Sequence, residues 1–323
     1  PWPPPMVFVL FVIGFVILII GANTLVDGAS SVGAKMKMSP VVIGFTIVAL
    51  GTSLPELIIN VFASARGETD LAVTNVLGSN IMNTLFIIGT SAFIYRIIPG
   101  RKTVITLVPI SLFAAIVLGA FANIRFNDPA LPHAISRIEG IVMVVLLVAY
   151  LLFSYLFSKS ESELIPDEIK TFTTGRSAAM IAGGVAGLYF GGTWVVDGAV
   201  ALATEFGMSS ALVGITIIAV ATSLPELVTS TIAALKKNSG VAIGNALGSN
   251  IFNVFLVLGV SSIIRPLPFN TALNFDMGVM IVSNLVVALF VYLGRGRMIT
   301  RLEGAIMMLV YLGYIVWLVL NNS

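Results

Sequence analysis

The chain has 323 residues, of which 58% are hydrophobic and only 10% are charged. A soluble globular protein of this size needs a larger share of charged residues on its surface. The composition therefore excludes a soluble protein and indicates an integral membrane protein. The net charge of +2 says little about partners, while the absence of cysteine excludes disulfide bonds and thiolate metal sites.

Apolar runs of about 20 residues, each able to cross a hydrocarbon core of roughly 30 Å as a helix, recur along the chain. Residues 1–5 (PWPPP) resemble a tag remnant and are left out of the fold prediction. The longest polar interruption, residues 159–176, is too short for a soluble domain. The runs predict an all-α membrane protein with ten spans, near residues 6–30, 39–63, 70–95, 102–122, 138–157, 179–203, 210–234, 240–263, 272–293 and 300–320.

Lys and Arg residues are distributed unevenly among the predicted loops. If the N-terminus is outside, 13 of the 17 fall in cytoplasmic loops. Because positively charged loops stay on the cytoplasmic side, this bias predicts the orientation. We therefore expect a multi-pass protein of the cell (plasma) membrane with both termini extracellular and the polar segment at 158–178 as a cytoplasmic linker.

The two halves of the chain are related by an internal duplication with an offset of 170 residues. Ten of fifteen positions are identical between 44–58 and 214–228, and eight of fifteen between 75–89 and 245–259. The predicted halves, 1–157 and 179–323, hold five spans each. An odd number of spans makes the second half enter the membrane from the opposite side, so the repeats are inverted. Inverted repeats with discontinuous helices around a midplane site are typical of secondary transporters.

The first repeated motif, TSLPE, places a proline beside a carboxylate in the middle of an apolar span. Pro55 and Pro225 lack a backbone N–H, so carbonyls one turn earlier lose their helical partner and become available to a cation. Glu56 and Glu226 lie in the first turn of the helix that follows, where the helix dipole favours the ionised carboxylate. An acidic residue at the membrane centre costs about 2.5 to 3.5 kcal/mol, so the pair predicts a cation site.

The second repeated motif is GSNIMN in the first half and GSNIFN in the second. It places Ser79 with Asn83, and Ser249 with Asn253, one helical turn apart on the same face. Together with the glutamates and the threonine and serine of TSLPE, these residues form a ligand set of oxygen atoms. Such a set suits hard cations such as Ca²⁺ and Na⁺, whereas transition metals usually recruit imidazole or sulfur.

Other polar residues have structural interpretations. Asn80 and Asn250 either belong to the site or form hydrogen bonds between helices. Asp27 and Asp197 fall toward helix ends and are interpreted as structural. His133, the single histidine, lies in a predicted outer loop.

GTSLPEL with GSNIMN, and TSLPEL with GSNIFN, resemble the two alpha-repeats of the sodium/calcium exchangers of the cation/calcium exchanger (CaCA) superfamily, in its prokaryotic type without a regulatory domain. The resemblance covers the whole chain. It implies a transporter and not an enzyme, with Ca²⁺ and Na⁺ as transported ions, no cofactor, the lipid bilayer as its surroundings, and neither a nucleic acid nor an obligate protein partner.

The resemblance also implies four cation sites in the middle of the membrane, and first and sixth spans that slide across the rest to expose them alternately. The implied ligands are Glu56, Glu226, Asn83, Asn253, Thr52, Ser53, Thr222, Ser223, Ser79 and Ser249, with the backbone carbonyls of Ala49 and Ala219.

Some relatives, including potassium-dependent ones, carry an aspartate at a position held here by Asn83 or Asn253. Two amides at these positions argue against potassium dependence. The site then carries two formal negative charges, from Glu56 and Glu226; one Ca²⁺ neutralises them, whereas three Na⁺ leave a net charge of +1. We therefore expect electrogenic exchange of three Na⁺ for one Ca²⁺. A proton-coupled cation antiporter of the same architecture and, less favoured by an inverted duplication, a Ca²⁺-permeable channel remain alternatives.

Overall fold

The computed structural model describes residues 4–36, 38–67, 69–100, 103–124, 133–158, 171–205, 222–294 and 297–322. The elements of the first half are α1 (Pro4–Lys35), α2 (Pro40–Ile43), η1 (Gly44–Val48), α3 (Ala49–Thr52), α4 (Leu54–Arg66), α5 (Thr69–Ile81), η2 (Met82–Ile87), α6 (Ile88–Ile94), η3 (Thr103–Leu107), α7 (Val108–Asn123), β1 (Ala134–Ile135) and α8 (Arg137–Ser158). Those of the second are α9 (Thr174–Glu205), α12 (Leu224–Leu235), α13 (Ser239–Phe252), η5 (Asn253–Leu258), α14 (Gly259–Ile264), β2 (Leu267–Pro268), η6 (Thr271–Leu273), α15 (Asn274–Leu293) and α16 (Arg301–Asn322).

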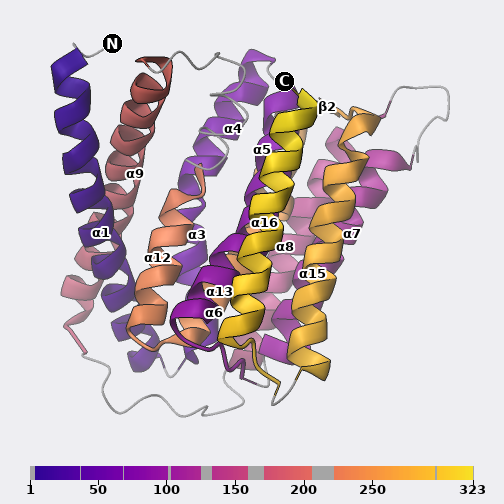
Figure 1. The fold of residues 1–323 in the computed structure, drawn as a ribbon. Coiled ribbons are helices and arrows are strands. Elements are labelled where there is room, and N and C mark those ends of the chain that lie inside the picture. The colour runs from indigo at the N-terminus through magenta and orange to yellow at the C-terminus, as the bar shows by residue number, and fades with distance from the viewer. Residues whose placement is uncertain are drawn as a thin grey trace.

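The long helices run side by side, as expected for a bundle that spans a membrane (Figure 1). Within the described ranges, eight helices are long and apolar enough to cross a bilayer, and the bent pair Pro40–Thr52 and Leu54–Arg66 makes a ninth span. The predicted span at 210–234 begins outside the described residues, and α12 is its second part. The predicted all-helical, multi-pass architecture is therefore confirmed, with nine of the ten spans seen in full or nearly so.

The helix breaks occur at the TSLPE motifs. The chain bends by 43° between α3 and α4. Ser53 precedes α4 with φ −86° and ψ 3°, and Ser223 precedes α12 with φ −91° and ψ 6°, so the two halves adopt nearly the same backbone at equivalent positions. In each case proline occupies the first turn of the new helix, where a backbone N–H would have no partner within that helix.

The helices with the Ser and Asn motifs widen into π-helix at the end of the motif. In the first half this segment is η2, and in the second it is η5, each six residues long. Single π turns inside α-helices are frequently found at functional sites because they rotate side chains away from the regular helical face. Asn83 lies in η2 and Asn253 in η5, so the π turns set the direction of both amides.

The last helix of each half packs against the other half. α16 lies along α6, and α8 lies along α14. A single β-bridge joins Ile97 to Ile299, and the short antiparallel pair of β1 and β2 joins the equivalent segments at the opposite end of the bundle (Figure 1). The halves are thus interlocked and do not form two separate bodies.

A repeated capping box begins both of these last helices. The backbone N–H of Ser136 donates to Glu139 at 2.6 Å, and the N–H of Glu139 donates back to the Ser136 hydroxyl at 3.3 Å. Thr300 and Glu303 form the same pair of bonds at 2.7 and 3.3 Å. These reciprocal bonds satisfy N–H groups that the start of a helix leaves without partners, which explains why both helices begin at these positions.

Helices α1 and α9, each 32 residues long, pack on each other through glycines. A Cβ atom on Gly21 would lie 2.9 Å from the carbonyl oxygen of Gly184, and one on Gly14 would lie 2.9 Å from that of Gly191. Small residues, and glycine above all, allow helix backbones to approach each other closely in a membrane. The two helices lie together at one side of the bundle (Figure 1).

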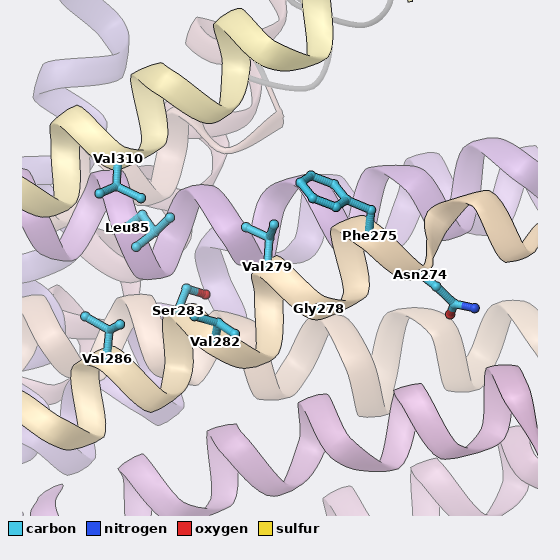
Figure 2. A pocket seen from close by; sticks show the side chains of 9 residues that line it. All are labelled: Leu85, Asn274, Phe275, Gly278, Val279, Val282, Ser283, Val286 and Val310. Atoms are coloured by element: carbon cyan, nitrogen blue, oxygen red, sulfur yellow. The ribbon is translucent and has the colours of Figure 1, made fainter. Parts of the chain in front are cut away.

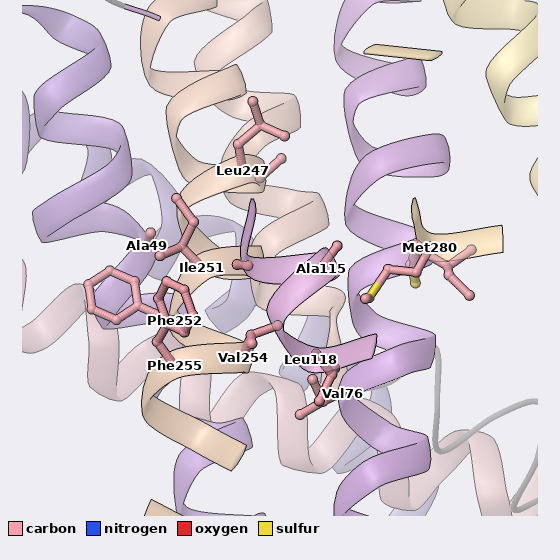
Figure 3. Close-up of a cluster of buried hydrophobic side chains, with 14 of the residues drawn as sticks. Ala49, Val76, Ala115, Leu118, Leu247, Ile251, Phe252, Val254, Phe255 and Met280 are labelled. Carbon is pink, nitrogen blue, oxygen red and sulfur yellow. The ribbon is translucent and has the colours of Figure 1, made fainter. Parts of the chain in front are cut away.

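The core of the bundle is formed by the two helices that carry the Ser and Asn motifs. The most apolar windows of Ala72–Ile94 and Ser239–Ile264 are 72% and 78% buried, against 17% for that of Arg301–Leu320. Their inward side chains, among them Ile251, Phe252 and Phe255, pack in the cluster shown in Figure 3. The Ser and Asn motifs are therefore held by the most enclosed of the eight long spans.

Candidate functional site

The two repeated motifs meet in the middle of the bundle. The hydroxyl of Ser53, from the first half, donates to Oε1 of Glu226 in the second half at 3.2 Å. Ser249 donates to the same oxygen at 3.4 Å. Ser53 is the residue before α4, and Glu56 lies in the first turn of that helix, so a side chain of one TSLPE motif reaches the glutamate of the other. One cluster therefore contains both intramembrane glutamates.

Most oxygens of these glutamates have no protein partner. Both residues are fully buried. Within the described residues, no hydrogen bond reaches either carboxylate oxygen of Glu56 or Oε2 of Glu226. The side-chain oxygens of Asn83 and Asn253 are also buried and without a partner there. Buried charges are costly unless they are paired or coordinate a metal ion, so this group of acceptors is chemically suited to cations.

Thr52 is oriented by an asparagine of the opposite half. Its hydroxyl lies 3.1 Å from Oδ1 of Asn245 and 3.2 Å from the carbonyl oxygen of Ala49. A hydroxyl has one proton to donate. When that proton goes to Asn245, the lone pairs of the Thr52 oxygen stay available to a cation. The Ala49 carbonyl oxygen also keeps one free lone pair, because the N–H of Ser53 binds only the other one, at 3.0 Å.

The orientation of the Asn245 amide follows from its other bonds. Its nitrogen donates to the Ser230 hydroxyl at 2.8 Å and to the carbonyl oxygen of Glu226 at 3.3 Å. Rotating the amide by 180° would place its oxygen against the carbonyl oxygen of Glu226, which can only accept, so the amide oxygen faces Thr52. The equivalent contact in the other half joins the hydroxyl of Thr222 to Oδ1 of Asn75 at 3.0 Å.

Asn80 and Asn250 form hydrogen bonds between the two central helices, one of the two roles left open by the sequence. Asn80 donates to the carbonyl oxygen of Asn250 at 3.3 Å, and Asn250 donates to Thr84 at 2.7 Å. Asn80 also accepts from the amide nitrogen of Asn253 at 3.1 Å. That bond leaves the Asn253 oxygen available, whereas Asn83 makes no such bond within the described residues.

The structure brings most of the predicted ligands into this one cluster. The Ser79 hydroxyl lies 3.5 Å from that of Thr222, and the Thr52 hydroxyl lies 3.4 Å from that of Ser249. The hydroxyl of Ser223 is buried and has no partner in the described part of the chain. The carbonyl of Ala219 lies outside the described residues. The predicted ligands that the structure describes as buried are Thr52, Ser53, Glu56, Ser79, Asn83, Thr222, Ser223, Glu226, Ser249 and Asn253.

Sequence reasoning missed Asn75 and Asn245. Both were visible as the first residues of the duplicated blocks NVLGSN and NALGSN, one helical turn before Ser79 and Ser249. The spacing places each asparagine on the face that carries the serine, but the sequence could not show that its partner is a threonine from the other half.

Two further polar residues interpreted as structural lie in other surroundings. Asp27 accepts from Lys236 at 2.6 Å, in an ion pair that ties α1 to the end of α12. His133 precedes β1, and its carbonyl accepts from the N–H of Phe269 at 2.8 Å.

Comparison with known proteins agrees with this arrangement. The sequence family described as "Sodium/calcium exchanger protein" matches residues 6–156 and 176–320. The chain is 37% identical over 322 residues to a protein named CaxA from Alkalimonas amylolytica, covering 95% of this chain and 96% of that one. It is 31% identical over 346 residues to the sodium/calcium exchanger MaX1 of Methanosarcina acetivorans, covering 96% and 97%.

A solved structure of the sodium-calcium exchanger NCX_Mj superposes on the fold with a TM-score of 0.82 at 28% identity, covering 97% of this chain and 99% of that chain. The family match spans nearly the whole sequence and includes both repeated motifs. This protein is therefore a membrane transporter that belongs to the sodium/calcium exchanger family.

Proposed function

We propose that this protein is an antiporter that exchanges Na⁺ for Ca²⁺ across the plasma membrane by alternating access. The observation that carries the proposal is the buried cluster around Glu56 and Glu226, in which three of the four carboxylate oxygens have no protein partner among the described residues. The surrounding donors are hydroxyl, amide and carbonyl oxygens, which are the ligands that Ca²⁺ and Na⁺ prefer.

The proposed ligands of the transported ions are the clustered residues of the two motifs. Glu56 and Glu226 supply charge, and the remaining residues supply neutral oxygen atoms. These are Thr52, Ser53, Ser79, Asn83, Thr222, Ser223, Ser249 and Asn253, with the carbonyls of Ala49 and, outside the described residues, Ala219.

The charge of the cluster supports a stoichiometry of three Na⁺ for one Ca²⁺. Asn83 and Asn253 are neutral, so the two glutamates together carry −2. One Ca²⁺ balances this charge, whereas three Na⁺ leave +1 to cross the membrane field. Exchange would then be electrogenic and independent of potassium.

The proposed repeats are residues 1–157 and 179–323, joined by a cytoplasmic linker at 158–178, with both termini outside. The similar backbone at Ser53 and Ser223 and the two π segments support the duplication. The glycine-lined contact between α1 and α9 is consistent with their movement as a pair.

The test is Ca²⁺ uptake by the purified protein in proteoliposomes, with Na⁺, K⁺ and pH gradients imposed one at a time. We expect an outward Na⁺ gradient to drive Ca²⁺ uptake equally in choline and potassium media. Uptake driven by a pH gradient and indifferent to Na⁺ would instead identify a proton-coupled antiporter. Uptake that requires no counter-ion gradient would identify a channel.

Electrogenicity is tested by clamping the membrane potential with potassium and valinomycin under fixed Na⁺ and Ca²⁺ gradients. Moving one charge through the membrane is worth about 2.3 kcal/mol per 100 mV. When Na⁺ leaves and Ca²⁺ enters, an inside-positive potential should accelerate uptake and an inside-negative one should slow it. Uptake insensitive to voltage would exclude the stoichiometry of three to one.

A further inference from the structure

A groove without a described role lies between α15 and α16. It has a volume of about 450 Å³, within the usual range of ligand pockets. Three of its lining residues, Phe275, Val282 and Val310, are 50%, 57% and 53% exposed, so the groove opens on the outer surface of the helix bundle. Leu85, from η2, is almost fully buried and forms its floor. The lining residues are shown in Figure 2.

The groove persists because α15 and α16 are anchored to different neighbours. α15 packs on α7 and α5, whereas α16 packs on α6. Near one end of the groove, the rings of Phe275 and Trp317 stack with centroids 4.1 Å apart, and the Tyr314 hydroxyl donates to Asp276 at 2.6 Å. These contacts hold the two helices at a set separation, so neither can move in to fill the space.

The polar groups of the lining are already paired. The side chains of Asn274 and Asn123 exchange two hydrogen bonds, at 2.8 and 2.9 Å. The hydroxyl of Ser283 donates to the carbonyl oxygen of Met280 at 2.8 Å. The other lining side chains are hydrocarbon, apart from Gly278, which has none. A polar ligand or a chain of water molecules would find few groups to bind, so the lining favours a hydrocarbon occupant.

We propose that this groove binds one acyl chain of a membrane lipid from the leaflet in which α15 begins. The lining runs along α15 from Asn274 to Val286, which is about 18 Å at 1.5 Å per residue. One leaflet of hydrocarbon is about 15 Å thick. The groove therefore matches the length of a single acyl chain whose headgroup lies near the start of α15.

Packing contacts, and not the exclusion of water, hold the acyl chain in the groove. Lipid tails are as apolar as leucine, so a protein gains little hydrophobic free energy by burying one. An acyl chain in the groove contacts α15, α16 and η2, whereas an acyl chain on a flat helix face contacts that face alone. Each additional contact contributes dispersion energy. Leu85, Ser283 and Val310, from η2, α15 and α16, all line the groove (Figure 2). Because Leu85 is two residues after Asn83, the bound chain touches the π segment that carries a proposed ligand.

The test uses intact protein in phosphatidylcholine vesicles containing a trace of lipid with a photoreactive diazirine in mid-chain. After illumination, mass spectrometry should locate adducts on Leu85 and Val286 at higher yield than on Val145, an exposed residue of α8. Gly278→Phe should fill the groove, since a Cβ there would meet no atom within 4 Å. We expect it to lower the Leu85 adduct about tenfold, as a loss of about 1.4 kcal/mol in binding would.

Gly313→Phe is the matched control, because Gly313 on α16 is equally open but does not line the groove. It should leave the adducts unchanged, and Val145 should be labelled equally in every protein. Val282→Trp is the second plugging variant if Gly278→Phe does not elute as a monodisperse folded protein. Adducts on Leu85 no more abundant than on Val145, or insensitive to both plugs, would overturn the proposal. None of these outcomes depends on the transported ions.

Discussion

The hydrogen bond between Thr52 and Asn245, which lie 193 residues apart in the sequence, leads to a testable prediction. If Asn245 accepts the Thr52 proton and so leaves oxygen lone pairs for a cation, removing either side chain should weaken the same ion contacts. Thr52→Val keeps the shape of the side chain and deletes the hydroxyl. Asn245→Ala deletes this acceptor, so the Thr52 proton turns to the oxygens that remain in reach, the Ala49 carbonyl at 3.2 Å and the Ser249 hydroxyl at 3.4 Å.

The expected magnitude follows from the bonds at stake. A neutral hydrogen bond contributes about 0.5 to 1.5 kcal/mol, and about 1.4 kcal/mol is a factor of ten in an equilibrium constant. Each single variant should therefore raise the Ca²⁺ concentration for half-maximal uptake by up to about tenfold. Because both substitutions act through one hydroxyl, the double variant should need no higher Ca²⁺ concentration for half-maximal uptake than the more affected of the two single variants.

The assay is Ca²⁺ uptake in proteoliposomes by the parent protein, the two single variants and the double variant, which together form a double-mutant cycle. Ser230→Ala is the control, since it removes a partner of Asn245 without touching the Thr52 contact. It should change half-saturation far less than Asn245→Ala. The reasoning is refuted if the effects of Thr52→Val and Asn245→Ala multiply in the double variant, because residues that act independently are additive in free energy.

Three further predictions follow from the site, the α1–α9 contact and the charge distribution. Glu56→Gln and Glu226→Gln should each abolish Ca²⁺ uptake while the protein stays folded, because an amide of the same shape removes half of the formal charge; near-normal uptake by either variant would exclude that residue from the site. Gly21→Val should lower the melting temperature in detergent, with a cost of about 1 to 3 kcal/mol for overpacking, whereas Gly183→Val, whose Cβ meets nothing within 4 Å, should not. Lys237→Cys should react with an impermeant thiol reagent only from the cytoplasm, and labelling from outside sealed cells would contradict the proposed orientation.

Local chemistry along the chain was enough to predict several features of this protein. Apolar runs of the right length predicted membrane helices because a backbone in hydrocarbon must satisfy its own hydrogen bonds. The cost of a buried carboxylate singled out Glu56 and Glu226, and proline predicted the helix break at Ser53 that the structure contains. The duplication, read as an offset of 170 residues, indicated that these features occur twice.

Which side chains come into contact could not be predicted without the folded bundle. The sequence placed Ser53 beside Glu56, yet its hydroxyl bonds to Glu226 from the other half. Asn245 had no predicted role until the fold brought it to Thr52. The π turns and the crossing of each last helix onto the opposite half were equally invisible. These features arise from the packing of helices more than a hundred residues apart, and such packing depends on shape complementarity across the whole bundle, which no local pattern of residues encodes.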